Sequence, residues 1–270
     1  MRRAAILCFC LVAGVAWAEN APSLDAAAFD RLRGADVVIA GEVHDNPQHH
    51  AVQADIAEKV QPVALVFEML TPEQAGRITP ELRGDAGALA EALEWEVSGW
   101  PDFGMYYPIM AAVPEARIYG AAVPREAARA AMSEGVDVTF GEDAAAFGLD
   151  VALPEAEQAE REAFQMAMHC DALPENILPG MVDVQRLRDA ELARAAMRAL
   201  DEIGGPVLVI TGNGHAREDW GVPVYLEPMR PDAEVVTVGQ GESGEAPAGV
   251  FDIVLSASAP EREDPCAAFK

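Results

Sequence analysis

The sequence is poor in positive charge, in aromatic residues and in cysteine. Its 270 residues include 19 Lys and Arg against 45 Asp and Glu, a formal charge of −26. A surface of this sign repels phosphate backbones and anionic headgroups, which argues against nucleic acids and membrane surfaces as partners. Beyond the first 18 residues, no apolar run approaches the roughly 20 residues of a spanning helix, so we expect no membrane insertion.

The first 18 residues have the pattern of a secretory signal peptide. Arg2 and Arg3 form a basic start, an apolar run covers 4–15, and Ala16-Trp17-Ala18 is a small-residue cleavage motif. The apolar run is too short to serve as a membrane anchor. We therefore expect cleavage after Ala18 and a periplasmic or secreted mature chain, 19–270, whose formal charge is −28 because two arginines are lost.

Two of the four cysteines lie in the signal segment, which leaves Cys170 and Cys266. An even number of cysteines in an oxidising compartment usually pairs, so the sequence predicts a disulfide between these two, with two free thiols as the alternative. The bond would tie the C-terminal tail to the segment around His169.

Short apolar runs rich in β-branched residues alternate with helical patterns along the chain. The runs lack polar alternation, which is typical of strands buried on both faces of a parallel sheet. Between them, Asn46-Pro47 begins a helix that reaches about Val60, and 154–203 is a long helical segment interrupted near Pro174. We expect 239–249 to be a loop. The fold class is α/β: a mostly parallel sheet flanked by helices in a single domain, with strands at 36–40, 63–67, 116–119, 206–211, 234–238 and 251–255.

All five histidines lie in three polar clusters, 41–50, 168–170 and 211–217. Two of these clusters directly follow predicted strands, and ligands of parallel sheets bind beyond the carboxyl ends of the strands. Histidine titrates near neutral pH and is the commonest nitrogen ligand of metals. The sequence therefore predicts that the histidines converge on one chemical site.

Glutamates accompany these histidines at the expected strand ends. Glu42 and His44 follow one strand, Glu68 ends the next, and His215 follows a third. Two glutamates and two histidines can act as general acid and base, or as a mixed oxygen and nitrogen metal site. The alternative is that both glutamates only cap or pair with neighbouring groups. His49 and His50 fall in the first turn of the following helix, where the helix dipole favours neutral imidazole.

Gln185, Arg188 and Asp189 share one helix face by their spacing. An arginine held by the neighbouring aspartate can receive a ligand carboxylate, although a solvated charged face is the simpler interpretation.

The densest aromatic stretch of the chain runs from Trp95 to Tyr107. Glycine and proline interrupt it, so it is typical of a loop that could serve as a lid over a wide, flat ligand, although aromatic residues are more often core. A tyrosine in this stretch, Tyr106 or Tyr107, could bind ferric iron as phenolate.

At these residues the sequence resembles the ChaN-like family of bacterial haem-binding uptake proteins. The matching pieces follow one another in order over nearly the whole mature chain, which makes them specific as a set. They are Gly41-Glu42-x-His44-Asp45-Asn46-Pro47-x-x-His50, Phe67-Glu68-Met69, Gly99-Trp100 with Tyr106, His169-Cys170 with Leu173-Pro174, Gln185-x-x-Arg188-Asp189 and Gly212-x-Gly214-His215-x-Arg217.

The resemblance implies an α/β protein of haem and iron uptake that holds haem at an exposed site through a tyrosine, with histidine near the propionates. It also implies a possible homodimer that stacks two haems. We expect Tyr106 to be the iron ligand, with Tyr107 as its competitor. Expected propionate contacts are His44, His50, His215, Arg188 and Arg217. The best-known members of the family are lipoproteins, whereas this chain lacks the lipid-accepting cysteine.

The wider superfamily that the sequence resembles also contains erythromycin-esterase-like hydrolases and Tiki-type metalloproteases. This resemblance implies an alternative function as an esterase or peptidase. In that case Glu42, His44, Glu68 and His215 would bind a divalent metal such as zinc, or one histidine would activate water directly.

Overall fold

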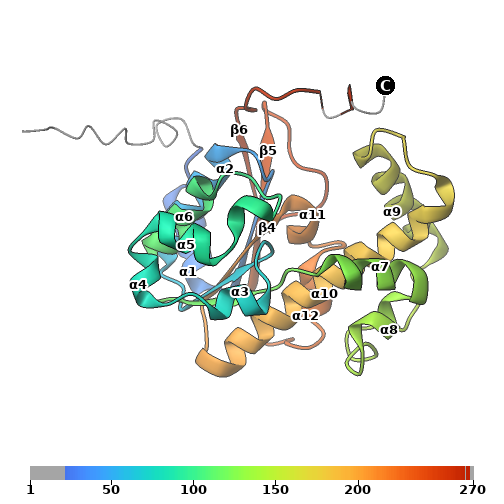
Figure 1. The fold of residues 1–270 in the computed structure, drawn as a ribbon, viewed down its shortest axis with the longest axis horizontal. Helices are drawn as coiled ribbons and strands as arrows, with labels where there is room; N and C mark the ends of the chain where they lie inside the picture. Colours follow the sequence, from blue (N-terminus) through green and yellow to red (C-terminus); the bar gives the residue numbers. More distant parts are fainter. Residues whose placement is uncertain (1–21, 265, 268–270) are drawn as a thin grey trace, which may run out of the picture.

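The computed structural model describes residues 22–264 and 266–267, so the predicted signal peptide and its cleavage site lie outside the described residues. A sheet of six parallel strands runs through the molecule and is covered by helices on both faces (Figure 1). The predicted fold class is confirmed. In the part of the chain that the structure describes, no helix combines the length and apolar character needed to cross a membrane.

Every predicted strand is present, and every strand pair is parallel. The strands are arranged in the order β3-β2-β4-β1-β5-β6, so β4 lies between β2 and β1. The chain therefore crosses over at the centre of the sheet. The strands are β1 Val37–Glu42, β2 Ala64–Phe67, β3 Arg117–Gly120, β4 Val207–Gly212, β5 Val235–Glu242 and β6 Ile253–Ala257.

Two hydrophobic cores lie on opposite faces of the sheet. The first lies under α1 Ala26–Gly34, α2 Pro47–Val60, α3 Pro72–Gly76, α4 Pro80–Arg83, α5 Ala86–Ala92, the 3-10 helix Trp95–Val97 and α6 Phe103–Ala112. The second lies under α7 Arg125–Glu134, α8 Val136–Phe140, α10 Leu178–Ile203 and α12 Val222–Leu226. The remaining helices are α9 Glu155–Met168, which packs on α10, the 3-10 helix Glu175–Ile177, and α11 Asn213–Ala216.

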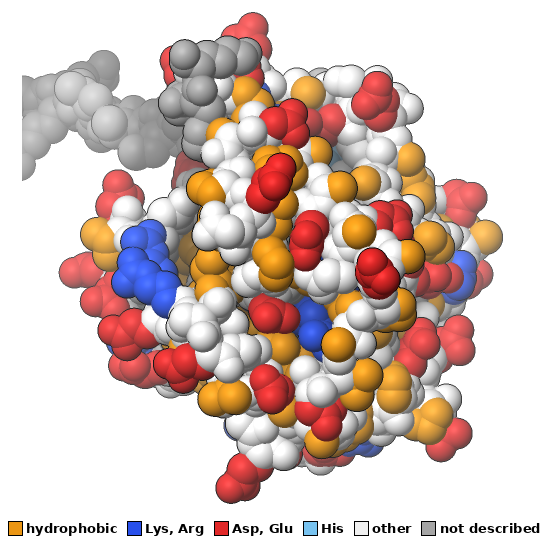
Figure 2. Space-filling model, turned by 90° about the vertical axis from the view of Figure 1, so that its right-hand side faces the viewer, with side chains coloured by type: hydrophobic (Ala, Val, Ile, Leu, Met, Phe, Trp, Pro, Cys, Tyr) orange, Lys and Arg blue, Asp and Glu red, His pale blue; other side chains and the backbone are white. Residues whose placement is uncertain are grey.

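Strand residues alternate between these cores, which explains the uninterrupted apolar runs. In β1, Val38 and Ala40 point into the first core, whereas Val37 and Ile39 point into the second. Because both faces are covered, every residue of β1 is buried and polar alternation is absent. The charge lies on the outer surface instead: Figure 2 shows acidic side chains scattered over one face of the molecule, with few cations among them.

The predicted start of α2 is confirmed: Pro47 is its first residue, and the Asn46 side chain accepts a hydrogen bond from the backbone of Gln48. Two other expectations were wrong. β5 extends to Glu242, which lies inside the expected loop. The second half of the aromatic stretch is the helix α6, which Asp102 caps by accepting from the Gly104 backbone, so the stretch is not a continuous lid loop.

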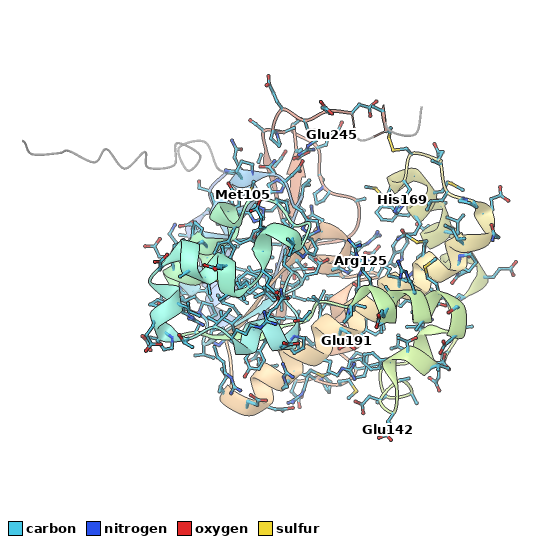
Figure 3. All side chains as sticks on the ribbon, in the orientation of Figure 1. Met105, Arg125, Glu142, His169, Glu191 and Glu245 are labelled. Carbon is cyan, nitrogen blue, oxygen red and sulfur yellow. A yellow bond between two sulfur atoms is a disulfide. The ribbon has the colours of Figure 1, made fainter. Side chains whose placement is uncertain are left out.

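The predicted disulfide is confirmed. Cys170 and Cys266 are bonded, with their α-carbons 5.5 Å apart, within the range that a disulfide can span. The bond joins the tail that follows β6 to the turn that follows α9 (Figure 3). It links two parts of the chain that are 96 residues apart.

We predict that Cys266→Ser lowers the free energy of unfolding by about 2–4 kcal/mol, because a cross-link over so long a loop restricts the unfolded chain. Urea unfolding of the oxidised protein and the variant measures the difference. The double variant Cys170→Ser/Cys266→Ser is the control and should match the single one. Equal stability of the oxidised protein and both variants would contradict the prediction.

Candidate functional site

The three central strands β2, β4 and β1 end side by side. Glu42 ends β1 opposite Gly212, the last residue of β4. Glu68 follows β2 directly, and its backbone N–H donates to Ile210 of β4. Acidic and imidazole side chains from three separate segments of the chain therefore lie together at this edge of the sheet.

The first group at this edge is centred on Glu42, which is almost completely buried. Its Oε1 lies 2.7 Å from Nδ1 of His44 and accepts a hydrogen bond of 3.0 Å from the hydroxyl of Tyr106. Its Oε2 lies 3.3 Å from Nδ1 of His50, but the two atoms are too misaligned to hydrogen bond. Nε2 of His50 donates to the backbone oxygen of His44. One buried carboxylate thus fixes one half-exposed imidazole, His44.

Burial lowers the pKa of His44, but the hydrogen bond to Glu42 and the charge of Glu68 outweigh it, so the net pKa is raised. A carboxylate can only accept, so Nδ1 of His44 carries the proton in its contact with Glu42. No described group pairs with Nε2 of His44.

The second group is centred on His215, which is buried between two carboxylates. Its Nδ1 lies 2.6 Å from Asp189, closer than the 3.0 Å to the Gln185 amide, and its Nε2 lies 3.4 Å from Glu68. Glu68 also accepts from the hydroxyl of Thr211 at 2.7 Å and from the backbone N–H of Gly212 at 2.9 Å. Both ring nitrogens of His215 therefore face a carboxylate, while Oδ2 of Asp189 has no hydrogen-bond partner among the described residues.

Burial lowers the pKa of His215, but Glu68 and Asp189 more than compensate and raise it to about 10. Although burial opposes it, the same pairing with His215 holds the pKa of Glu68 far below its ordinary value. His215 is therefore an imidazolium at neutral pH. Both of its ring N–H groups are donors, so it has no lone pair for a metal or a proton.

Gly212 separates the two groups. A side chain here would place its Cβ only 3.0 Å from Nε2 of His44 and 3.8 Å from Glu68 Oε2. Glycine therefore keeps space open beside the free nitrogen of His44. On another side, the half-buried ring of Trp100 meets the His44 ring edge-on, with the centroids 5.0 Å apart.

The tyrosines do not lie at an exposed site, contrary to expectation. The Tyr106 ring is fully buried, 4.3 Å from the His50 ring and 4.9 Å from the Trp95 ring. Burial and the charge of Glu42 raise its pKa far above the ordinary value, which disfavours phenolate. Tyr107 is half-buried and donates to the backbone oxygen of Arg83. An iron-binding role for Tyr106 stays a prediction, and it requires the side chain to leave the core.

The two candidate arginines lie in opposite environments. Arg217 is buried, bonded to Asp219, with its guanidinium 3.7 Å from the centroid of the Trp220 ring. Arg188 is exposed and forms no ion pair with any described residue. Asp189 does not hold Arg188, because it turns inward to His215, and the exposed Arg188 fits the simpler interpretation of a solvated charge. The sequence spacing placed Asp189 and Gln185 on one face, but it did not reveal their partner.

The remaining histidines take no direct part in the site. His49 accepts from the backbone of Val43 and donates to Gly241. His169 follows α9 and donates from Nδ1 to the backbone oxygen of Gln165, and it lies beside α9, away from the sheet (Figure 3). Convergence of all five histidines was thus wrong for His169, because α9 packs on α10 and not on the sheet.

Among the described residues, no group of three or more His, Cys, Asp or Glu is arranged to hold a metal ion. Each of Glu42 and Glu68 is already paired with an imidazole. The zinc alternative therefore receives no support from this arrangement.

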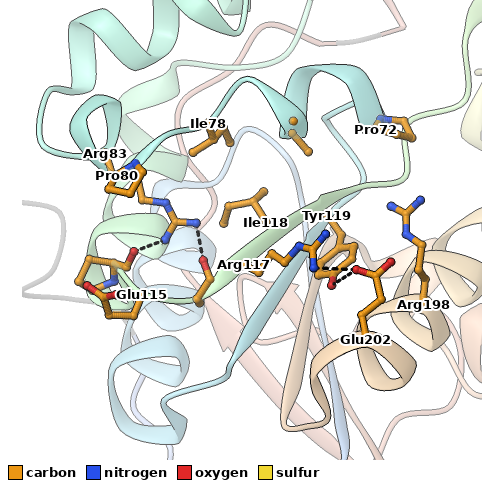
Figure 4. Close-up of a pocket in the computed structure, with 14 residues that line it drawn as sticks. Pro72, Ile78, Pro80, Arg83, Glu115, Arg117, Ile118, Tyr119, Arg198 and Glu202 are labelled. Carbon is orange, nitrogen blue, oxygen red and sulfur yellow. Dashed lines mark hydrogen bonds and ion pairs between the residues drawn. The ribbon is translucent and has the colours of Figure 1, made fainter.

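A separate cavity of about 570 Å³ lies along the edge strand β3 (Figure 4). Three of its polar side chains are already engaged: Glu202 accepts from the hydroxyl of Tyr119 and pairs with Arg117, and Arg83 donates to backbone oxygens. No histidine lines it. It is distinct from the histidine site and offers no comparable reactive group.

Comparison with known proteins identifies the family of this chain. Residues 28–226 match the family described as haem-binding uptake, Tiki superfamily, ChaN. The chain belongs to this ChaN family. No curated protein matches the sequence.

A solved structure of a ChaN protein shares the fold of this chain. The Campylobacter jejuni ChaN structure, whose title describes cofacial heme binding, is 18% identical, covers 84% of this chain and 89% of its own, and superposes with a TM-score of 0.63. The type III effector HopBA1 is 13% identical, with 86% and 92% covered and a TM-score of 0.45. The likeness to the Campylobacter jejuni ChaN structure establishes a shared fold.

We predict that the free energy of unfolding falls by a few kcal/mol between about pH 6.5 and pH 10, the ordinary and folded pKa values of His215. Stability from a raised pKa is complete below the unfolded value and is lost as the pH rises through the folded value. Glu68 has the opposite effect at acid pH. Because its pKa is lowered in the folded protein, the free energy of unfolding should also decrease as the pH falls below about 4.5.

Urea unfolding at a series of pH values measures this dependence. His215→Gln keeps a hydrogen-bonding side chain but cannot titrate, so most of the decline between pH 6.5 and 10 should disappear in the variant. If the free energy of unfolding depended on pH in the same way in both proteins, His215 would not be the group responsible for the decline.

Proposed function

We propose that this chain is an exported haem-binding protein of haem and iron uptake, with haem as its cargo. The observation that carries the proposal is membership of the ChaN haem-binding uptake family over residues 28–226. The carboxyl edge of the sheet supports it, because an indole ring and a half-exposed imidazole meet there, at Trp100 and His44. A disulfide between Cys170 and Cys266 agrees with an oxidising compartment such as the periplasm.

The residues expected around the propionates divide into two kinds. Arg188 has an exposed guanidinium without a carboxylate partner among the described residues, in a chain where acids outnumber bases 45 to 19. An unpaired arginine of this kind can receive a propionate in a bidentate contact. His50, His215 and Arg217 are buried and bonded within the protein, so we assign them to holding the site together.

Titration of haemin into the purified protein, followed by its Soret spectrum, tests the proposal. Binding should produce a saturable spectral change. A spectrum identical to that of free haemin would overturn the proposal. Sedimentation of the loaded protein would show whether a homodimer forms, as the cofacial arrangement named for Campylobacter jejuni ChaN suggests.

We predict that Arg188→Gln weakens haemin binding about fivefold, because one exposed charge contact of about 1 kcal/mol is lost. Arg198→Gln is the matched control. Arg198 is also an exposed arginine of α10 without an ion pair, but it stands ten residues, roughly 15 Å, further along the helix and stacks on Tyr119. Equal dissociation constants for both variants would exclude the specific contact.

A metal-free hydrolase is the second candidate function, and the geometry of two imidazoles that are each held by a buried carboxylate favours it. Glu42 orients His44, whose neutral form has a free Nε2 to take a proton from water. His215 is held as an imidazolium close by, where it can stabilise negative charge that develops on an acyl oxygen.

If the chain is a hydrolase, Glu68→Gln should lower turnover of an ester or peptide substrate by about 10²–10³-fold, because the imidazolium loses the carboxylate that maintains it. The same variant should leave haemin affinity intact. A substrate screen with elemental analysis of the same protein provides the measurement. Absence of turnover in the wild-type protein would leave haem binding as the function.

A further inference from the structure

We propose that the cavity between α9, α10 and α12 binds a small carboxylic acid with an apolar body, whose carboxylate is received by Arg161 and Arg186. The cavity measures about 390 Å³, which is within the usual range of ligand sites. No histidine lines it, so it is separate from the carboxyl edge of the sheet. The proposed haem function does not use this cavity, and the inference goes beyond that function.

Two buried arginines supply the positive charge of the cavity. The side chains of Arg161 and Arg186 both line it, and they are only 5% and 7% exposed. Each keeps one buried guanidinium nitrogen, Nη1 of Arg161 and Nε of Arg186, without a hydrogen-bond partner among the described residues. A buried charged donor that lacks an acceptor is costly, so both side chains point to an acceptor that the protein does not itself supply.

The neighbouring acids do not neutralise both arginines. Glu157 accepts from Nε and Nη2 of Arg161, at 2.9 and 2.5 Å. Arg186 donates through Nη2 to two backbone oxygens, and its ion-pair partner Asp183 is 3.8 Å away, beyond hydrogen-bond distance. The charged side chains that line the cavity are Arg161, Arg186 and Glu157, which leaves one positive charge. This balance fits a ligand with a single carboxylate.

Tyr225 adds a neutral hydrogen-bond donor to the lining. The residue is buried, and burial and the charge of Asp189 outweigh the opposing charge of Arg186 and raise its pKa to about 12. The hydroxyl therefore keeps its proton at neutral pH. A carboxylate accepts from a hydroxyl as well as from guanidinium groups, whereas a cation would be repelled by the two arginines.

The rest of the lining is apolar, and it indicates the other half of the ligand. Phe147, Leu153 and Pro154 form part of it. Val151 and Val224 also line the cavity, although they are 63% and 38% exposed. A hydrocarbon body that covers these valines would remove apolar surface from water. The combination of apolar walls with a few polar groups is typical of sites for organic ligands, and it favours an amphipathic carboxylate over an inorganic anion.

Isothermal titration calorimetry of the purified protein with octanoate tests the proposal. Two matched probes each lack one half of octanoate: 1-octanol keeps the chain without the charge, and acetate keeps the charge without the chain. Octanoate should bind saturably, with one molecule per protein chain, and both matched probes should bind about 10-fold more weakly or worse. Octanol that binds as tightly as octanoate would remove the arginines from the proposal. The absence of saturable octanoate binding would overturn it.

A negative charge placed at the rim tests the location of the site. Val224→Asp adds a carboxylate at an exposed position of α12 in the cavity lining, so it should weaken octanoate binding about 10-fold by repulsion. Val138→Asp is the matched control, because Val138 is an exposed valine of α8 that does not line the cavity, and it should bind octanoate as the wild type does. Equal dissociation constants for the two variants would exclude this cavity.

Two further measurements test the arginines and separate the ligand from haem. Arg161→Gln should weaken octanoate binding, whereas Arg194→Gln, which changes an arginine of α10 outside the cavity lining, should not. Unchanged affinity in a folded Arg161→Gln variant, checked by thermal melting, would overturn the carboxylate contact, and Val224→Asp keeps the test open if that variant is unstable. Saturating haemin should leave octanoate bound. Displacement by haemin would assign the two arginines to a haem propionate and overturn a separate ligand.

Discussion

The rest of the site depends on the pairing of buried carboxylates at the ends of the central strands. Glu68 and Asp189 are buried, and ionised carboxylates in such a place need a cation and hydrogen bonds. His215 supplies the charge, and Thr211 and Gly212 supply the remaining donors to Glu68. Removal of one partner would leave an uncompensated charge between β2, β4 and α10. This constraint fixes α11 and the middle of α10 against the sheet.

Glu42 extends the constraint to the other side of Gly212. Three side chains from two helices and a loop surround one carboxylate: His44 from the loop, His50 from α2 and Tyr106 from α6. The packing of α2 on α6 is therefore coupled to the orientation of the His44 ring. Tyr106 is buried because its hydroxyl has this partner, since a buried phenol needs one.

The sequence reveals most of the fold because the signals are local. Uninterrupted β-branched runs identified each strand, and Asn46-Pro47 located the start of α2. Because Glu42, His44, Glu68 and His215 lie at or just after the ends of predicted strands, the sequence also predicted that they meet. The partner of Asp189 was not visible, because the choice between Arg188 and His215 depends on helix rotation and on a residue 26 positions away. Tyr106 was misplaced for a similar reason: α6 is apolar on nearly all sides, so its sequence does not show which face is buried.

The two candidate functions make conflicting demands on the carboxyl edge of the sheet. As a general base, Nε2 of His44 must be free to take a proton from water. Glu42 supports that role, because it stabilises the positive charge that the ring acquires on binding a proton. A flat ligand that covers the rings of Trp100 and His44 would keep water from this nitrogen. One site therefore cannot perform both functions at once, and bound haem would inhibit any hydrolysis.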